Sequence, residues 1–162
     1  MKEEHVKWYS HTLGREMETL IYGHQGYPVL LFPSSQGRYY EAKDFHLIEA
    51  VKWYLEQGLV KIYCPDSIDS LSWYNEGIHP ADRVRNHILY DKYLVDELLG
   101  KIRHETGHGK ICVTGPSFGA FHALNFAFRH PDVVSHLFAM SGKYDIKSFL
   151  DGYYDDNAYF NN

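Results

Sequence analysis

The sequence predicts an α/β domain in which a mostly parallel sheet is covered by helices on both faces. Short apolar runs typical of buried strands recur along the chain, and segments with helical spacing alternate with them. A serine turn flanked by glycines also joins one of these strands directly to a helix. No linker, internal repeat or low-complexity tract interrupts residues 1–162, so we expect a single domain.

Three strands and one helix are predicted in the first part of the chain. Residues 16–22 alternate like a half-buried strand, and residues 28–32 form a continuous apolar run between turn signals. Apolar residues at roughly helical spacing predict a helix over residues 41–57, which Gly58 ends. Residues 59–64 are the next apolar run and the next predicted buried strand.

A long loop separates these elements from the remaining ones. Residues 65–80 exceed the usual connection of about 2–6 residues, and ordered loops of this length are more often functional than idle. Apolar spacing then predicts a long helix over residues 84–102, and a strand over residues 110–115 follows it. A helix over residues 117–129 and a final strand over residues 134–140 complete the predicted elements.

The final strand is apolar enough for the interior of a sheet, yet no later segment could pair beside it. An apolar strand left at an edge is a template for association with other chains. We therefore expect that part of the fold is absent from this chain. We also expect the chain to associate, with a homo-oligomer as one outcome.

The motif with the clearest chemistry is Gly-Pro-Ser-Phe-Gly at residues 115–119. Between a strand and a helix, G-x-S-x-G is typical of a serine nucleophile held on a sharp turn, which makes Ser117 the candidate nucleophile. Side chains at Gly115 and Gly119 would crowd that turn. The alternative is that Ser117 only caps the following helix.

A nucleophilic serine needs hydrogen-bond donors for the oxyanion of the tetrahedral intermediate. One donor is expected to be the backbone N–H of Phe118, the residue after the serine. The second is expected from the loop at residues 33–38, where Ser35 is the first choice and Gln36 the alternative. An ordinary turn would contain the same residue types.

The histidines of the chain do not supply an obvious base for Ser117. His122 lies about 140° around the helix from Ser117, and His136 lies in the first half of the last strand. His79, in the 65–80 loop, is a surrogate candidate, although a solvated loop histidine is the simpler interpretation. Asp145 is a candidate acid or an ordinary turn aspartate, and no histidine follows it.

The chain resembles the group of α/β-hydrolases known as putative esterases, whose relatives include S-formylglutathione hydrolases, enterochelin esterases and mycolyltransferases. The likeness runs along nearly the whole chain and is most specific at residues 114–125, with further matching segments at residues 22–33, 64–75, 130–132 and 141–145. It implies hydrolysis of a small carboxylic ester or thioester through an acyl-enzyme on Ser117, without metal or organic cofactor.

The resemblance also implies roles for residues outside the serine turn. Trp73 and Tyr74 become candidate substrate-pocket residues, and packing of the loop onto the domain is the alternative for both. The family's acid and histidine normally lie on two further strand units, so we expect an α/β-hydrolase fold truncated before those units, with the partners of Ser117 beyond Asn162. Two other functions stay open: an acyltransferase with the same nucleophile, and a non-catalytic binding protein that uses the tyrosine-rich loop.

Composition limits the other partners. A net charge of −5 argues against nucleic acid or an anionic membrane as the main partner. No stretch approaches the roughly 18 apolar residues of a membrane span, and charged residues near Met1 occupy the place of a signal-peptide apolar run. Cys64 and Cys112 lie within apolar runs, which indicates core thiols in a reducing compartment and predicts a cytoplasmic location.

Overall fold

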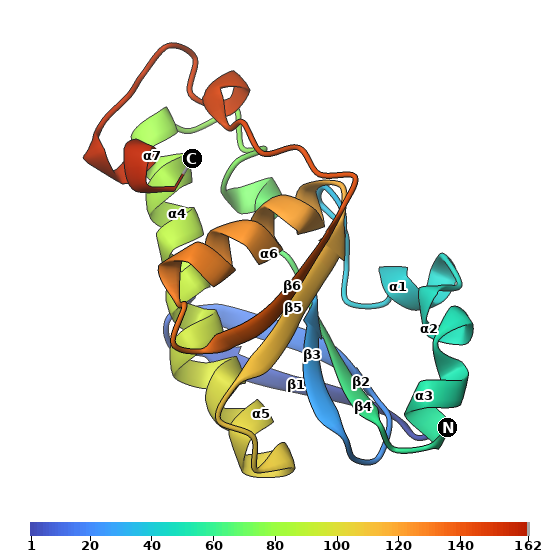
Figure 1. Ribbon diagram of the computed structural model, residues 1–162. Helices are drawn as coiled ribbons and strands as arrows, with labels where there is room; N and C mark the ends of the chain where they lie inside the picture. The colour runs from blue at the N-terminus through green and yellow to red at the C-terminus, as the bar shows by residue number, and fades with distance from the viewer. Residues whose placement is uncertain (162) are drawn as a thin grey trace.

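A six-stranded sheet forms the centre of the computed structural model, which describes residues 1–161 (Figure 1). The strand order is β1-β2-β4-β3-β5-β6. β1 pairs with β2 and β2 with β4 in antiparallel fashion, whereas the pairs β4–β3, β3–β5 and β5–β6 are parallel. The strands are β1 (Glu3–Ser10), β2 (Arg15–Tyr22), β3 (Tyr27–Leu31), β4 (Val60–Pro65), β5 (Ile111–Pro116) and β6 (Val134–Met140). The predicted mostly parallel sheet is confirmed.

Helices cover both faces of this sheet, as predicted (Figure 1). One face carries α1 (Glu41–Asp44), α2 (Leu47–Ala50) and α3 (Lys52–Glu56); the other carries α4 (Pro80–Tyr93), the π-helical turn η2 (Leu94–Leu98), α5 (Leu99–Thr106) and α6 (Phe118–Arg129). Adjacent residues of β3 point to opposite faces. Leu30 belongs to the buried cluster that contains Phe126 of α6, and Leu31 belongs to the cluster that contains Ile48 of α2.

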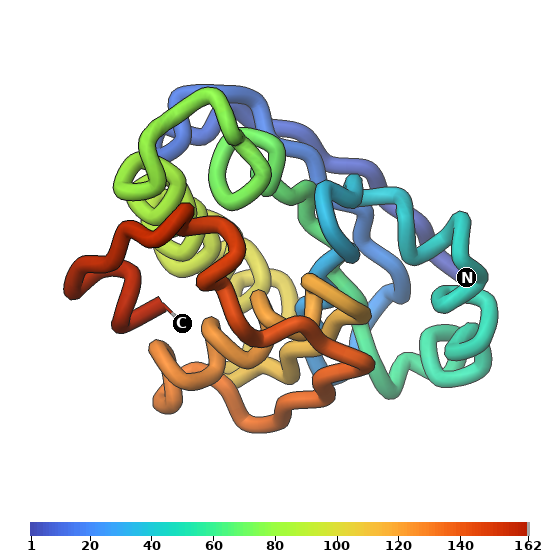
Figure 2. Tube along the Cα trace, turned by 90° about the horizontal axis from the view of Figure 1, so that it is seen from above, coloured from blue at the N-terminus to red at the C-terminus, as the bar shows by residue number. Residues whose placement is uncertain are grey.

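A third buried cluster joins the C-terminal segment to the rest of the molecule. This segment contains the 3₁₀ turn η3 (Lys147–Phe149) and the helix α7 (Asp156–Phe160). Ile146 and Phe149 are buried in the same cluster as Trp73 and Phe118. Figure 2 shows the segment, in red, running beside α6 and α4. It therefore packs against the domain next to the serine turn.

Two features of the structure differ from the predictions. The predicted helix over residues 41–57 is wrong as a single element, because the chain leaves helical geometry twice: His46 has a left-handed φ of 59°, and Val51 has φ −107° and ψ 9°. The strand β1 was not predicted. It is held by Glu97 in η2, which accepts hydrogen bonds from Trp8 Nε1 at 2.9 Å and from Ser10 Oγ at 2.8 Å.

The last strand, β6, lies at the edge of the sheet. Its side chains are mostly exposed, and Phe138 is 61% exposed. In the part of the chain that the structure describes, no strand pairs with the outer side of β6. This arrangement agrees with the expected apolar edge, and association through it stays a prediction.

Both cysteines are buried and unpaired, as predicted. Cys64 lies in β4 and Cys112 in β5. Burial raises the pKa of both thiols, and it raises the pKa of Cys112 to about 11. Both therefore stay protonated at neutral pH and act as core side chains.

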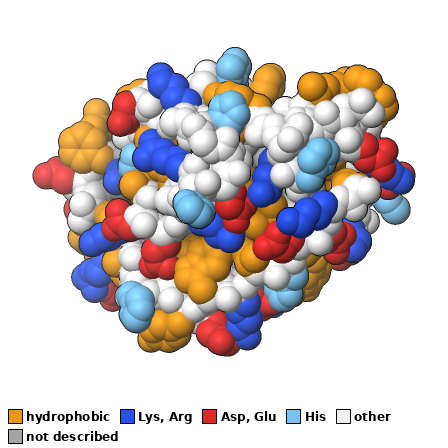
Figure 3. Space-filling model, turned by 90° about the horizontal axis from the view of Figure 1, so that it is seen from below, with side chains coloured by type: hydrophobic (Ala, Val, Ile, Leu, Met, Phe, Trp, Pro, Cys, Tyr) orange, Lys and Arg blue, Asp and Glu red, His pale blue; other side chains and the backbone are white. Residues whose placement is uncertain are grey.

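Acidic, basic and histidine side chains are interspersed on the face seen from below in Figure 3. One partly buried ionic network is formed by Lys61 of β4 and Glu105 of α5. Glu105 accepts hydrogen bonds from Lys61 Nζ and from the Tyr63 hydroxyl, both at 2.8 Å, and it also pairs with Lys101. Burial alone would raise the pKa of Glu105, but these three donors outweigh burial and lower it from 4.5 to about 2.

The lowered pKa of Glu105 predicts loss of stability in acid. The network contributes fully above pH 4.5, where Glu105 is ionised in both the folded and the unfolded chain, and its contribution disappears as the pH falls towards 2. Because solvent screens this partly exposed group, we expect Glu105→Gln to cost about 1 kcal/mol at pH 7. Urea unfolding at pH 7 and pH 3 tests this: the difference between wild type and variant should shrink at pH 3. A difference that stays constant would contradict the prediction.

Candidate active site

Ser117 lies at the sharp turn between β5 and α6, which we call the elbow (residues 115–119). Its backbone has φ 55° and ψ −120°, a conformation that is costly for a non-glycine residue. The Ser117 amide donates to the Met140 carbonyl at 2.9 Å, which ties the elbow to the end of β6. The side chain is exposed and makes no capping hydrogen bond to α6. Ser117 occupies the N-cap position of α6, but its hydroxyl does not cap the helix, so the capping alternative gains no support.

The two elbow glycines allow close backbone contacts, as expected. A Cβ atom on Gly115 would lie 2.6 Å from the backbone of Gly119. A Cβ atom on Gly119 would lie 2.5 Å from the Pro33 carbonyl oxygen and 2.6 Å from that of Phe32. Since these neighbours are backbone atoms, they cannot move aside cheaply. The first turn of α6 therefore rests directly against the start of the 33–38 loop.

Hydrogen bonds hold the 33–38 loop on both sides of Ser35. The Ser34 amide donates to Glu41 at 2.6 Å, and the Gln36 amide donates to Asp69 Oδ2 at 3.0 Å. Within residues 1–161, the structure shows no acceptor for the Ser35 amide. Of the two residues that the sequence leaves open as an oxyanion donor, Gln36 already uses its N–H and Ser35 does not. The geometry thus favours Ser35.

The Phe118 amide is the second candidate donor. Phe118 is the first residue of α6, and the first amides of a helix have no acceptor inside the helix. Its ring is fully buried beside Phe121, at a centroid distance of 4.9 Å. The buried ring fixes the residue, and its amide lies at the positive end of the helix, where anions are favoured.

The two predicted pocket residues occupy different places. Tyr74 is half-buried beside the elbow: its hydroxyl donates to Ser35 Oγ at 2.8 Å, and its ring packs edge-on against Phe118 at 5.7 Å. Trp73 is fully buried and packs edge-on against Phe121 at 5.9 Å. Trp73 thus packs the loop onto α6 in this structure, which is the alternative to a role in the substrate pocket. Its role in a substrate pocket stays a prediction.

The histidines named from the sequence do not reach Ser117. His122 is buried, with Nε2 2.8 Å from Asp69 Oδ1. His79 caps α4, because its Nδ1 accepts from the Ala81 amide at 3.2 Å, so its use as a surrogate base gains no support. His136 is exposed on β6. Within residues 1–161, no histidine hydrogen-bonds to Ser117.

Asp145, the candidate acid, is engaged in a turn. It accepts a hydrogen bond from the Lys147 amide at 2.8 Å, which is the local bond of a turn aspartate.

Across residues 1–161, no group of three metal-ligating side chains is close enough to hold an ion. No helix among the described residues is long and apolar enough to cross a membrane. Among the described residues, those that contact the elbow include the end of β6, the start of the 33–38 loop, Tyr74 and Phe149.

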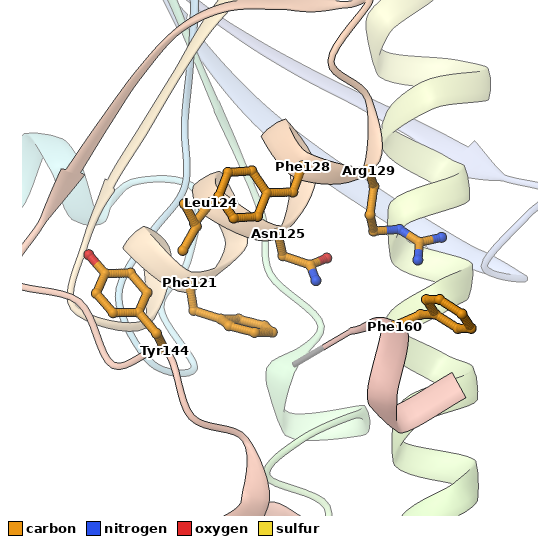
Figure 4. A pocket seen from close by; sticks show the side chains of 7 residues that line it. All are labelled: Phe121, Leu124, Asn125, Phe128, Arg129, Tyr144 and Phe160. Atoms are coloured by element: carbon orange, nitrogen blue, oxygen red, sulfur yellow. The ribbon is translucent and has the colours of Figure 1, made fainter. Parts of the chain in front are cut away.

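A cavity of about 490 Å³ lies against the outer side of α6 (Figure 4). Figure 4 shows that its walls come from α6 and from the C-terminal segment, with Phe121, Phe128, Tyr144 and Phe160 as aromatic walls and Arg129 at one end. Ser117 does not line this cavity. We therefore place the candidate active site at the elbow and not in the cavity.

Sequence reasoning missed Asp69. This carboxylate is buried and bonds to both Gln36 and His122, so it links the 33–38 loop to α6. The segment around it is rich in aspartate and serine, which is an ordinary loop composition. No local signal distinguishes Asp69 from Asp66, because both of its partners are distant along the chain.

The sequence matches a protein family, and the fold is similar to that of several solved structures. Residues 10–159 match a family model described as "Putative esterase". S-formylglutathione hydrolase FrmB from Staphylococcus aureus is similar, with a TM-score of 0.66 and 13% identity, over 98% of this chain and 65% of that one. A ferulic acid esterase gives a TM-score of 0.68 and 18% identity, over 87% of this chain and 58% of that one. No curated protein matches the sequence.

A third similar structure is the enterobactin esterase FES from Shigella flexneri, with a TM-score of 0.61 and 17% identity, over 88% of this chain and 37% of that one. At such identities these likenesses show the fold, which is that of the α/β-hydrolases. The chain spans 65% and 58% of the lengths of the first two structures.

Proposed function

Because the chain belongs to the family described as "Putative esterase", we propose that it is a serine hydrolase that cleaves a small carboxylic ester or thioester through an acyl-enzyme on Ser117. The observation that supports this most is the elbow itself. Ser117 adopts a costly left-handed φ of 55°, yet its hydroxyl is exposed and caps nothing. A strained serine whose hydroxyl has no structural partner is best explained by a chemical task of that hydroxyl.

In the proposed reaction, Ser117 Oγ attacks the carbonyl carbon of the ester and its proton passes to a base. The amides of Phe118 and Ser35 stabilise the oxyanion of the tetrahedral intermediate. The intermediate collapses, the base returns the proton to the departing alcohol or thiol, and water then hydrolyses the acyl-enzyme by the same two steps. Residues 1–161 supply no histidine at Ser117, so the proposal assigns the base and its acid to residues beyond Asn162.

Tyr74 is the proposed pocket residue, because its ring lies against Phe118 and its hydroxyl against Ser35. The chemistry needs no metal or organic cofactor. We propose a cytoplasmic location, which two buried, unpaired cysteines support. The partner is a small-molecule ester.

The acyl-enzyme can be tested with the product of the complete reading frame that contains residues 1–162. Phenyl butyrate and p-nitrophenyl butyrate share an acyl group and differ in the leaving group. With methanol added, both should give the same ratio of methyl butyrate to butyric acid, because both pass through one butyryl-enzyme. A ratio that depends on the leaving group, or no hydrolysis of either ester, would contradict the proposal. Methyl butyrate as the main product would identify an acyltransferase instead.

A further inference from the structure

The 66–79 loop is hydrogen-bonded to the 33–38 loop and its neighbour Tyr39 at successive positions. Seen from above, the two loops lie on the same side of the molecule (Figure 2). The bonds run from Tyr74 Oη to Ser35 Oγ, from the Gln36 amide to Asp69, from Ser67 Oγ to the Gly37 carbonyl, and from Arg38 Nε and the Tyr39 amide to Asp66. These bonds fix the conformation of residues 35–39 against the 66–79 loop.

Asp69 is the more deeply buried of the two aspartates that bond to this part of the chain, since Asp66 is 9% exposed. Asp69 is 1% exposed and begins the 3₁₀ turn η1 (Asp69–Leu71). Its Oδ2 accepts the Gln36 amide at 3.0 Å, and its Oδ1 lies 2.8 Å from His122 Nε2. Asp69 Oδ1 and His122 Nε2 are therefore hydrogen-bond partners in the buried interior. Both contacts of Asp69 are needed, because a buried carboxyl group without partners is very costly.

The bond to Asp69 acts on the candidate oxyanion loop in two ways. Gln36 has a left-handed φ of 55°, and its amide is the group that Asp69 holds in that conformation. Asp69 also occupies the Gln36 N–H, so that the Ser35 N–H is the one that stays unpaired between two fixed neighbours. His122 sits on α6, the helix that begins beside Ser117, so the same carboxylate joins the loop to the elbow helix.

We infer that Asp69 is a positioning residue that fixes the 33–38 loop so that the Ser35 amide faces the elbow. The effect on the loop stands on the geometry alone, and the effect on catalysis rests on the proposed function. A purely structural role is the competing explanation, in which Asp69 only stabilises the packed domain. The two explanations differ in what happens to the loop when the domain stays folded.

The chain offers a matched control for this distinction. Asp91 of α4 is 7% exposed, and His130 Nε2 lies 2.9 Å from its Oδ1 at the far end of α6. This is a second aspartate–histidine pair, partly buried, between α4 and the residue that ends α6, and Arg129 Nε also lies 3.4 Å from Asp91 Oδ2. In the described residues, Asp91 makes no hydrogen bond to the 33–38 loop. Asp91→Ala should therefore destabilise the fold without moving that loop.

The experiment compares Asp69→Ala, Asp69→Asn and Asp91→Ala in the product of the complete reading frame. Asp69→Ser, which cannot span the distance to Gln36, is the second variant if alanine does not fold. Amide hydrogen exchange of Gln36 and the ¹H–¹⁵N shift of Ser35 report the loop. Steady-state kcat and KM on p-nitrophenyl butyrate report its consequence.

In Asp69→Ala, Gln36 exchange should rise at least tenfold, the Ser35 signal should shift, and kcat should fall roughly 10- to 100-fold with KM changed less than threefold. Asp69→Asn should restore most of the Gln36 protection and most of kcat. Its side-chain oxygen can accept from the Gln36 amide, while its NH₂ can donate to a His122 tautomer that accepts at Nε2. Asp91→Ala should leave the Gln36 exchange rate and kcat within twofold of wild type, and the Ser35 signal should not shift.

Unchanged Gln36 exchange in Asp69→Ala would overturn the inference, and so would equal losses of kcat in Asp69→Ala and Asp91→Ala. Exchange is measured without substrate. If no variant or wild type hydrolyses the ester, the proposed function fails while the exchange data still decide whether Asp69 holds the loop.

Discussion

Replacing Ser117 by alanine is expected to lower kcat for ester hydrolysis by at least three orders of magnitude. The variant lacks the oxygen that forms the acyl bond, and only the residual effect of binding and of the oxyanion donors remains. Steady-state hydrolysis of p-nitrophenyl butyrate by the product of the complete reading frame measures this loss. The fold should be unaffected, because the Ser117 hydroxyl makes no capping bond in the structure.

Ser35→Ala is the matched control for Ser117→Ala. It removes a hydroxyl from the same site and breaks the bond from Tyr74, but it keeps the backbone N–H that is expected to act. We expect kcat to fall less than about tenfold, which is the size of one lost side-chain hydrogen bond. A Ser117→Ala protein with wild-type turnover would refute the role of Ser117. A thousandfold loss in Ser35→Ala would refute the assignment of the backbone donor.

The second large effect is expected at Gly119. Alanine there would place a Cβ atom 2.5–2.6 Å from the carbonyl oxygens of Pro33 and Phe32. Relief of this overlap must move α6 or the 33–38 loop, so we expect a cost of about 3 kcal/mol or more. For a domain of this size that corresponds to a fall in Tm of roughly 10 °C. Thermal unfolding followed by circular dichroism provides the measurement.

Gly100→Ala is the control for this substitution. Gly100 lies inside α5, and a Cβ atom there would meet nothing within 4 Å. Because alanine is the better helix former, we expect a gain of up to about 1 kcal/mol and no loss of activity. A Gly119→Ala variant as stable as wild type would show that the elbow is not close-packed.

The elbow and the layered fold were predictable because their signals are local. The apolar strand, the two glycines and the apolar helix around Ser117 are contiguous, so sequence alone placed Ser117 between β5 and α6. The strands β3 and β4 were equally recognisable from their unbroken apolar runs, as strands covered on both faces are. In β1, by contrast, Val6 and Trp8 alternate with His5 and Lys7, a period-two pattern typical of a half-buried strand, yet this segment was not among the predicted elements.

The remaining features depend on contacts between distant residues. His46 has no sequence signal that predicts a left-handed conformation, so the break between α1 and α2 could not be foreseen. The choice between Ser35 and Gln36 was also open, because it is decided by Asp69, 33 residues further along the chain than Gln36. Asp69 itself resembles any loop aspartate until the fold buries it beside His122.

The proposed nucleophile, Ser117, can be identified directly by treating the product of the complete reading frame with a fluorophosphonate, followed by tryptic digestion and tandem mass spectrometry. We expect one phosphonyl adduct per chain, on the Oγ of Ser117. An adduct on a different residue, or an active esterase that is neither labelled nor inhibited, would contradict this assignment.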